Sequence, residues 1–98
     1  MVLKVHKMGT AALKIKLMPE SPDSDLEAIK NKAKELALKH NKVLVHSIEE
    51  QDIAFGLKAV IITLVWPEEL EQSVIEEEYA KIENVNSVQI VDFRRVVG

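Results

Sequence analysis

Residues 52–66 read Asp52-Ile-Ala-Phe-Gly-Leu-Lys-Ala-Val-Ile-Ile-Thr-Leu-Val-Trp66, and this stretch decides the fold. From Leu57 onward nearly every residue is apolar and many are β-branched, which is typical of a buried central strand. Ahead of it, residues 43–49 form a second strand-like run that ends in acidic residues. The sequence therefore predicts two strands that a short connection joins.

The connection between these strands carries Phe55, an exposed or folded-back aromatic residue, followed by Gly56. Glycine adopts backbone angles that are closed to other residues, so the chain can turn sharply there while Phe55 points outward. Two interpretations of the ring follow. Either it folds back and closes the end of the core, or it is held out to enter a binding partner.

The strand expected before this pair lies at residues 13–17. Leu13, Ile15 and Leu17 alternate there with Lys14 and Lys16, which predicts a half-buried strand with one face open to water. The two lysines are therefore expected on the open face of the sheet.

A first helix is predicted after the loop at residues 18–23. Ser24 and Glu27 match a capping box at its start, and Asn41 is expected in the left-handed position at its end. Its apolar face repeats at steps of three and four residues, through Leu26, Ile29, Ala33, Leu36 and His40.

A second helix is predicted from Pro67 to about Ile82, because proline suits the first helical position. Asn84 is expected to end it, and residues 85–96 supply a last strand. The predicted buried positions of the helix are Leu70, Val74, Ile75, Tyr79 and Ile82. The last strand is expected to place Val88, Ile90 and Asp92 on one face, and Gln89, Val91 and Phe93 on the other.

The predicted order of elements is βαββαβ. This order gives an α+β, ferredoxin-like sandwich, in which a four-stranded antiparallel sheet carries both helices on one face. With 98 residues, the chain has room for one such domain and no second core.

Composition excludes several classes of function. The net charge of −3 argues against a general nucleic-acid binder, and the predicted strands at residues 13–17 and 57–65 lack the aromatic pair that stacks bases. The chain has no cysteine, so disulfides and thiolate metal sites are excluded. No segment approaches the roughly 18 apolar residues of a membrane span, and because residues 1–7 lack a sustained apolar stretch we expect no signal peptide. We therefore expect a cytoplasmic protein without a membrane contact.

Neither a catalytic centre nor a metal site is expected. The histidines His6, His40 and His46 lack the spacing of metal ligands. The acidic cluster at residues 49–52 lies on a turn, where neighbouring carboxylates are usually solvated. The glycines are isolated, so no phosphate-binding loop exists. We expect no cofactor and no covalent chemistry.

Three blocks of sequence carry a resemblance to a known family. They are Lys14-Ile-Lys-Leu-Met-Pro-Glu-Ser-Pro-Asp-Ser-Asp-Leu-Glu27, Ile48-Glu-Glu-Gln-Asp-Ile-Ala-Phe-Gly-Leu-Lys-Ala59 and Val91-Asp-Phe-Arg-Arg95. Together they resemble the archaeal branch of the translation elongation factor 1-beta family, over residues 8–98. The resemblance implies an exchange domain at residues 8–98 and a short N-terminal extension at residues 1–7.

The function that this resemblance implies is guanine-nucleotide exchange. The partner is then the GDP-bound GTPase elongation factor 1-alpha, whose nucleotide release the domain promotes during polypeptide elongation. Phe55 is implied to enter a pocket of the GTPase near its magnesium and phosphate site, with Ala54 and Gly56 beside it. Arg94 and Arg95 are implied to make secondary contacts with acidic groups.

One departure from the family pattern concerns the C-terminus. Eukaryotic relatives place a lysine there, whose ammonium can take the place of the magnesium ion, whereas this chain ends Val96-Val97-Gly98. We expect a monomer that makes no direct contact with nucleic acid. The alternative is a small-molecule-binding regulatory or dimerisation domain of the same ferredoxin-like fold.

Overall fold

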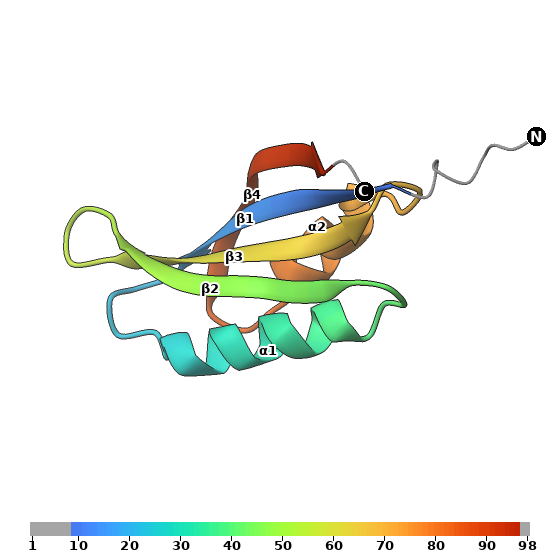
Figure 1. The fold of residues 1–98 in the computed structure, drawn as a ribbon. Coiled ribbons are helices and arrows are strands. Elements are labelled where there is room, and N and C mark those ends of the chain that lie inside the picture. The colour runs from blue at the N-terminus through green and yellow to red at the C-terminus, as the bar shows by residue number, and fades with distance from the viewer. Residues whose placement is uncertain (1–8, 97–98) are drawn as a thin grey trace, which may run out of the picture.

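The computed structural model describes residues 9–96 and contains the predicted βαββαβ order (Figure 1). The predicted extension at residues 1–7 lies outside the described residues, as do Val97 and Gly98. The elements are β1 (Thr10–Pro19), α1 (Leu26–Leu38), β2 (Leu44–Asp52), β3 (Lys58–Pro67), α2 (Gln72–Ala80) and β4 (Val85–Val96).

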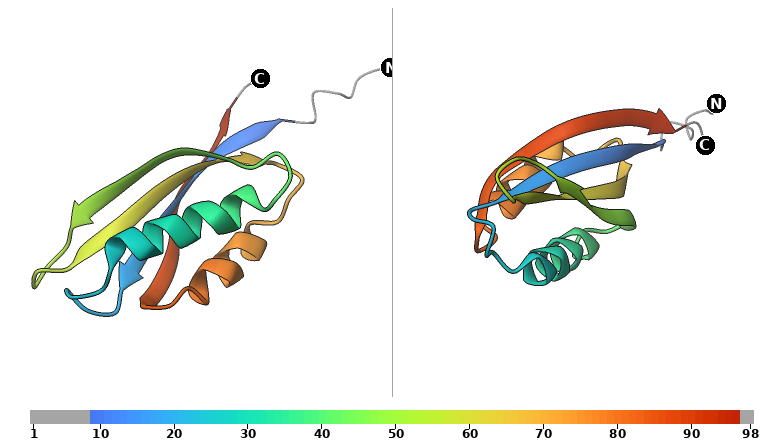
Figure 2. Two further views of the ribbon diagram at one scale, coloured as in Figure 1. Left: turned by 90° about the horizontal axis from the view of Figure 1, so that it is seen from below. Right: turned by 90° about the vertical axis from the view of Figure 1, so that its left-hand side faces the viewer.

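The four strands form one sheet in the order β2-β3-β1-β4, and every neighbouring pair is antiparallel. Both helices cover the same face of this sheet (Figure 2). The ferredoxin-like α+β prediction is therefore confirmed. The apolar strand β3 lies between β2 and β1, as expected of a central strand.

The core lies between the sheet and the two helices. Alternate residues of β1 and β3 face each other in pairs there, and Leu13, Ile15 and Ile62 are fully buried. Lys14 and Lys16 occupy the intervening positions of β1, so they lie on the open face as predicted.

Two aromatic side chains of the core also make polar contacts. The Tyr79 hydroxyl of α2 donates to the carbonyl of Ala33 in α1 at 2.8 Å. The Trp66 indole of β3 donates to the carbonyl of Leu70 at 2.8 Å. Because both rings are fully buried, these bonds satisfy polar atoms that would otherwise be left without a partner in an apolar environment.

The predicted ends of α1 are wrong by one residue each. Asp25, not Ser24, is the N-cap, and its side chain accepts from the Ala28 amide at 3.2 Å. The Ser24 hydroxyl instead accepts from the Ser21 amide and closes the preceding turn. After the helix, the left-handed residue is Lys42, at φ 73°, in place of the predicted Asn41.

The predicted start of α2 is also wrong. Pro67 ends β3, and the helix begins at Gln72. The intervening residues form a turn in which the Leu70 amide donates to the Pro67 carbonyl at 3.1 Å. The indole of Trp66 uses the Leu70 carbonyl as its acceptor, so a local side-chain hydrogen bond stabilises this turn ahead of the helix. The predicted end is also wrong, because α2 ends at Ala80 and not at Ile82, and Asn84, at φ 72°, lies in the turn between the helix and β4.

A β-bulge in β4 changes which side chains share a face. The register places Ile90 opposite Ile15 but Asp92 opposite Lys14, so Val91 is an extra residue. Asp92 therefore lies on the open face beside Lys14, and the prediction that it shares the face of Val88 and Ile90 is wrong. Beyond the bulge, Phe93 lies opposite the buried Leu13 and therefore on the face that the helices cover. The prediction that it shares a face with Gln89 is also wrong.

Replacing Tyr79 by phenylalanine should lower the free energy of unfolding by about 1 kcal/mol, because the change removes only the hydroxyl that binds Ala33. Burial raises the pKa of Tyr79 above its ordinary value of 10. Above that pH the unfolded tyrosine ionises and the native one does not, so the wild-type protein loses stability while Tyr79→Phe lacks this titration.

Urea unfolding of both proteins at neutral and strongly alkaline pH measures this effect. The stability difference between the wild type and Tyr79→Phe should shrink at the alkaline pH. A difference that is constant with pH would contradict the buried, protonated hydroxyl.

Candidate functional site

The connection between β2 and β3 is a tight turn at the tip of a projecting hairpin (Figure 1). The Leu57 amide donates to the Ala54 carbonyl at 3.0 Å, and the Ile53 amide donates to the Leu57 carbonyl at 2.8 Å. The two central residues both have positive φ, at 58° for Phe55 and 78° for Gly56. This is the type I′ arrangement, whose twist matches that of the flanking strands.

Phe55 has the most unusual environment in the hairpin. Its side chain is 94% exposed, so the ring does not close the end of the core, and that interpretation of the sequence is wrong. A residue with a Cβ pays about 1–2 kcal/mol to adopt the left-handed conformation. The fold thus holds a large apolar ring in water on a strained backbone, and strain of this kind gathers at functional sites.

Gly56 is required by its backbone angles and not by lack of space. Its φ of 78° is one that residues with side chains rarely adopt, whereas an added Cβ would meet nothing within 4 Å. The sharp turn predicted at this glycine is therefore present. The space beside Gly56, next to Phe55, is therefore open on this chain.

One ion pair joins the hairpin to helix α1. Lys30 of α1 lies 2.6 Å from Glu50 of β2 and 3.2 Å from Glu27, while Lys58 of β3 lies 4.0 Å from Glu50. Among the ion pairs of residues 9–96, the Lys30–Glu50 pair is the one that joins a helix to the sheet. The pairing with Lys30 lowers the pKa of Glu50, and the pairing with Glu50 raises that of Lys30. This contact joins β2 to α1 close to the turn that carries Phe55, and sequence spacing did not predict it.

The two predicted arginines lie far from the hairpin and point to opposite faces. Figure 1 shows the end of β4 and the hairpin at opposite ends of the molecule. Arg94 is opposite Ala12 on the open face, and its Nε lies 2.9 Å from Asp92. Arg95 Nε lies 2.6 Å from the carboxylate of Glu68 in the β3–α2 turn. The structure thus groups Ala54 with Phe55 and Gly56 and keeps the arginines apart from them.

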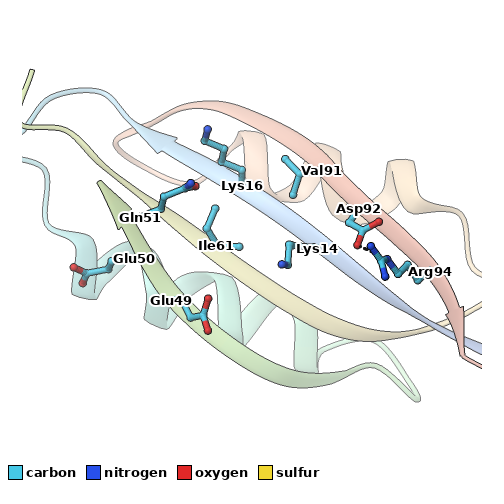
Figure 3. Close-up of a pocket in the computed structure, with 9 residues that line it drawn as sticks. All are labelled: Lys14, Lys16, Glu49, Glu50, Gln51, Ile61, Val91, Asp92 and Arg94. Carbon is cyan, nitrogen blue, oxygen red and sulfur yellow. Dashed lines mark hydrogen bonds and ion pairs between the residues drawn. The ribbon is translucent and has the colours of Figure 1, made fainter. Parts of the chain in front are cut away.

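The open face of the sheet contains a broad hollow of about 690 Å³. It combines charged side chains with an apolar floor (Figure 3). Its lining consists of Lys14, Lys16, Glu49, Glu50, Gln51, Ile61, Val91, Asp92 and Arg94. The alternation of Lys14 and Lys16 was the available sequence signal, but the part played by β4 depends on the bulge.

The described residues contain no group of three His, Cys, Asp or Glu side chains arranged to hold a metal ion. His40 Nε2 instead lies 2.9 Å from Glu78 of α2, and His46 is exposed on β2. His6 lies outside the described residues. Over residues 9–96, neither helix is long and apolar enough to cross a membrane.

Comparison with known proteins gives a family match over almost the whole described fold. The family model described as "EF-1 guanine nucleotide exchange domain" matches residues 12–96. "Elongation factor 1-beta" of Methanosarcina barkeri is 46% identical over 90 residues, which are 91% of this chain and 100% of the relative. The protein of the same name from Methanothermobacter thermautotrophicus is 38% identical, over 92% of this chain and 100% of the relative.

A solved structure with a similar fold is the ACT domain from GTP pyrophosphokinase of Chlorobium tepidum. It is 11% identical, with a TM-score of 0.58 over 84% of this chain and 99% of that domain. At this identity the likeness concerns the fold alone.

Phe55→Asn should raise the free energy of unfolding by up to about 1 kcal/mol, because asparagine adopts positive φ at lower cost and Asn-Gly is favoured in type I′ turns. The matched control is Phe55→Val, which places a β-branched residue at the same backbone angles and should lower the free energy of unfolding. Thermal unfolding of the three proteins measures both changes. A destabilised Phe55→Asn would show instead that the ring makes a stabilising contact.

Glu50→Gln should destabilise the protein at neutral pH and have no effect in strong acid. Since the folded-state pKa of Glu50 is lowered from 4.5, its contribution is present above that pH and is lost as the carboxylate protonates. The pKa of Lys30 is raised from 10.5, so the same contribution is also lost in strong alkali. Melting temperatures of wild type and variant across this range provide the measurement.

Glu35→Gln is the matched control for this experiment. It removes a more exposed carboxylate on α1, 3.8 Å from Lys32, and should change stability little at any pH. Equal effects of the two substitutions at neutral pH would show that the Lys30–Glu50 contact does not anchor the hairpin.

Proposed function

Because this chain belongs to the EF-1 guanine nucleotide exchange domain family, we propose that it binds the GDP-bound form of the GTPase elongation factor 1-alpha. As a member of that family it is a guanine-nucleotide exchange factor of translation elongation. The alternative, a small-molecule-binding regulatory or dimerisation domain, is not favoured by this membership. The exchange domain is assigned to residues 8–98.

The observation that supports a binding role for the hairpin is the exposure of Phe55. The ring is 94% exposed and its backbone has a positive φ, so the ring contributes almost no burial to the fold of the domain. A buried aromatic anchor is worth about 2 kcal/mol or more in protein interfaces. Insertion of the ring into a pocket of the GTPase would therefore recover free energy that the isolated domain forgoes. Ala54 and Gly56 form the backbone that approaches the same pocket.

The mechanism is thermodynamic linkage between the factor and the nucleotide. A factor that weakens GDP binding must itself be weakened by GDP to the same extent. A roughly thousand-fold change in nucleotide affinity requires about 4 kcal/mol of coupling. Phe55 can supply a large part of this amount, and the remainder comes from other contacts. No bond is made or broken in the factor, so it acts without covalent chemistry and without a cofactor of its own.

Arg94 and Arg95 are proposed as secondary contacts with acidic groups of the GTPase. Each already lies beside a carboxylate of its own chain, Asp92 or Glu68. Binding would therefore exchange an exposed internal ion pair for an intermolecular one, and such exposed pairs are worth about 1 kcal/mol or less. We propose further that the factor works as a monomer in the cytoplasm, with the GTPase and not a nucleic acid as its direct partner.

Phe55→Ala should fold normally and lose most of its exchange activity. The substitution removes only exposed apolar surface from the free domain, but it removes the proposed anchor from the complex. The measurement is the release of fluorescent GDP from elongation factor 1-alpha with substoichiometric factor.

Leu38→Ala is the matched control, since Leu38 is also an exposed apolar side chain, at 54%, and lies at the end of α1. It should leave exchange unchanged. If wild-type factor fails to accelerate GDP release from an active GTPase, the proposed function is wrong. If Phe55→Ala retains full activity, exchange does not depend on the hairpin.

A further inference from the structure

The open face of the sheet carries two cations at its centre. Lys14 and Lys16 alternate on β1, which lies between β3 and β4. Figure 3 shows both side chains on the face away from the helices, with Ile61 and Val91 beside them. These residues line the hollow of about 690 Å³. The hollow is thus a concave surface with cationic groups in its middle.

The charges of these two lysines are not compensated within the described fold. Residues 9–96 provide no ion-pair partner for Lys14 or Lys16, although the chain has a net charge of −3. Asp92 lies directly across from Lys14, yet its carboxylate is bound by Arg94 at 2.9 Å. Glu50 is likewise bound by Lys30. Of the three carboxylates that line the hollow, Glu50 and Asp92 are therefore engaged with other cations, and only Glu49, on β2 at its edge, is not. The two lysines on β1 thus leave the centre of the hollow positively charged, where an anion is attracted.

The geometry of the lysines matches an extended chain. Residues two apart on a strand stand about 7 Å from each other on the same face. Alternate side chains of an extended partner segment have the same spacing, so two carboxylates of the form acidic-x-acidic can meet Lys14 and Lys16 together. The floor next to them is apolar, with Ile61 8% exposed and Val91 42% exposed, and can accept an apolar side chain of that segment.

We propose that this hollow is a second contact surface for the GTPase, which an extended acidic segment of the partner occupies along β1. The inference rests on the proposed function and adds to it the chemistry of a further contact. Glu49 stands on the β2 side of the hollow, across Ile61 from Lys16. Repulsion from Glu49 keeps the acidic segment over β1 and away from β2.

The position of the hollow favours the same partner that the hairpin binds. Gln51 and Glu49 line it from β2, and β2 leads directly into the turn that holds Phe55. The two surfaces are therefore continuous along one strand. A nucleic acid fits less well, because no described aromatic ring lines the hollow for stacking its bases.

The test is the double variant Lys14→Gln/Lys16→Gln in the GDP-release assay at low and high salt. The concentration of factor that gives half-maximal acceleration should rise about tenfold at low salt, which corresponds to two exposed ion pairs. The maximal rate should be unchanged, and the difference should shrink as salt screens the pairs. Lys32→Gln/Lys34→Gln, the same loss of charge on the exposed surface of α1, is the control and should behave as wild type.

A crosslinking experiment identifies the occupant. Gln89 lies opposite Lys16 on β4, so a photoreactive benzophenone residue introduced there should crosslink to a GTPase segment that contains alternate acidic residues. A crosslink to a segment without them would overturn the proposal. Sedimentation of the wild-type factor and the double variant tests whether a second copy of this chain fills the hollow instead. A wild-type dimer that the lysine substitutions dissociate would show that a second copy fills the hollow.

Failure of this proposal is distinguishable from failure of the proposed function. If Phe55→Ala loses exchange while Lys14→Gln/Lys16→Gln equals wild type at every salt concentration, the contact at the hollow is wrong and the exchange function stands. If wild-type factor does not accelerate GDP release at all, both are wrong.

Discussion

The pairing of β1 with β3 is the constraint on which the rest of the structure depends. Leu13 faces Leu64 and Ile15 faces Ile62 in the buried layer, so Lys14 is forced onto the opposite face. A slip of one residue would turn the lysines of β1 into the core, where an unpaired charge is very costly. The same ladder makes β3 a rigid central strand, and the hairpin that carries Phe55 projects from its end. Core packing and the placement of both candidate surfaces therefore have one origin.

The Phe55 turn combines a strained backbone at the tip of the hairpin with a well-packed core elsewhere in the domain. The left-handed backbone at Phe55 opposes folding, the exposed ring contributes no burial to it, and the core is large enough to tolerate this cost. The ion pair of Glu50 with Lys30 joins the hairpin to α1 close to the turn, so the backbone that carries the ring is held by the body of the domain. A ring on a fixed backbone loses less conformational entropy on binding than a ring on a mobile loop, which favours its use as an interface anchor.

Several local features depend on side-chain contacts and strand register that residue-type patterns do not encode, and sequence patterns misplace them. The helix start at Pro67 follows local propensity, but the Trp66 indole needs the Leu70 carbonyl and holds a turn there. The prediction for Asp92 follows strict alternation, which fails where Val91 forms a bulge. Arg94 and Arg95 are neighbours in sequence, yet a strand sends neighbouring side chains to opposite faces. They consequently pair with carboxylates on different sides of the sheet.

The order of elements and the identity of the central strand were determined by the sequence alone, because apolar periodicity is a local property that the hydrophobic effect acts on directly. The same holds for the positive-φ turn at Gly56, which only glycine adopts readily. The exposure of Phe55 was decided by tertiary structure, since the sequence allowed the ring to fold inward as well as outward. The uncompensated charge of Lys14 was decided there too, because only the folded sheet shows that its neighbour Asp92 is bound by Arg94.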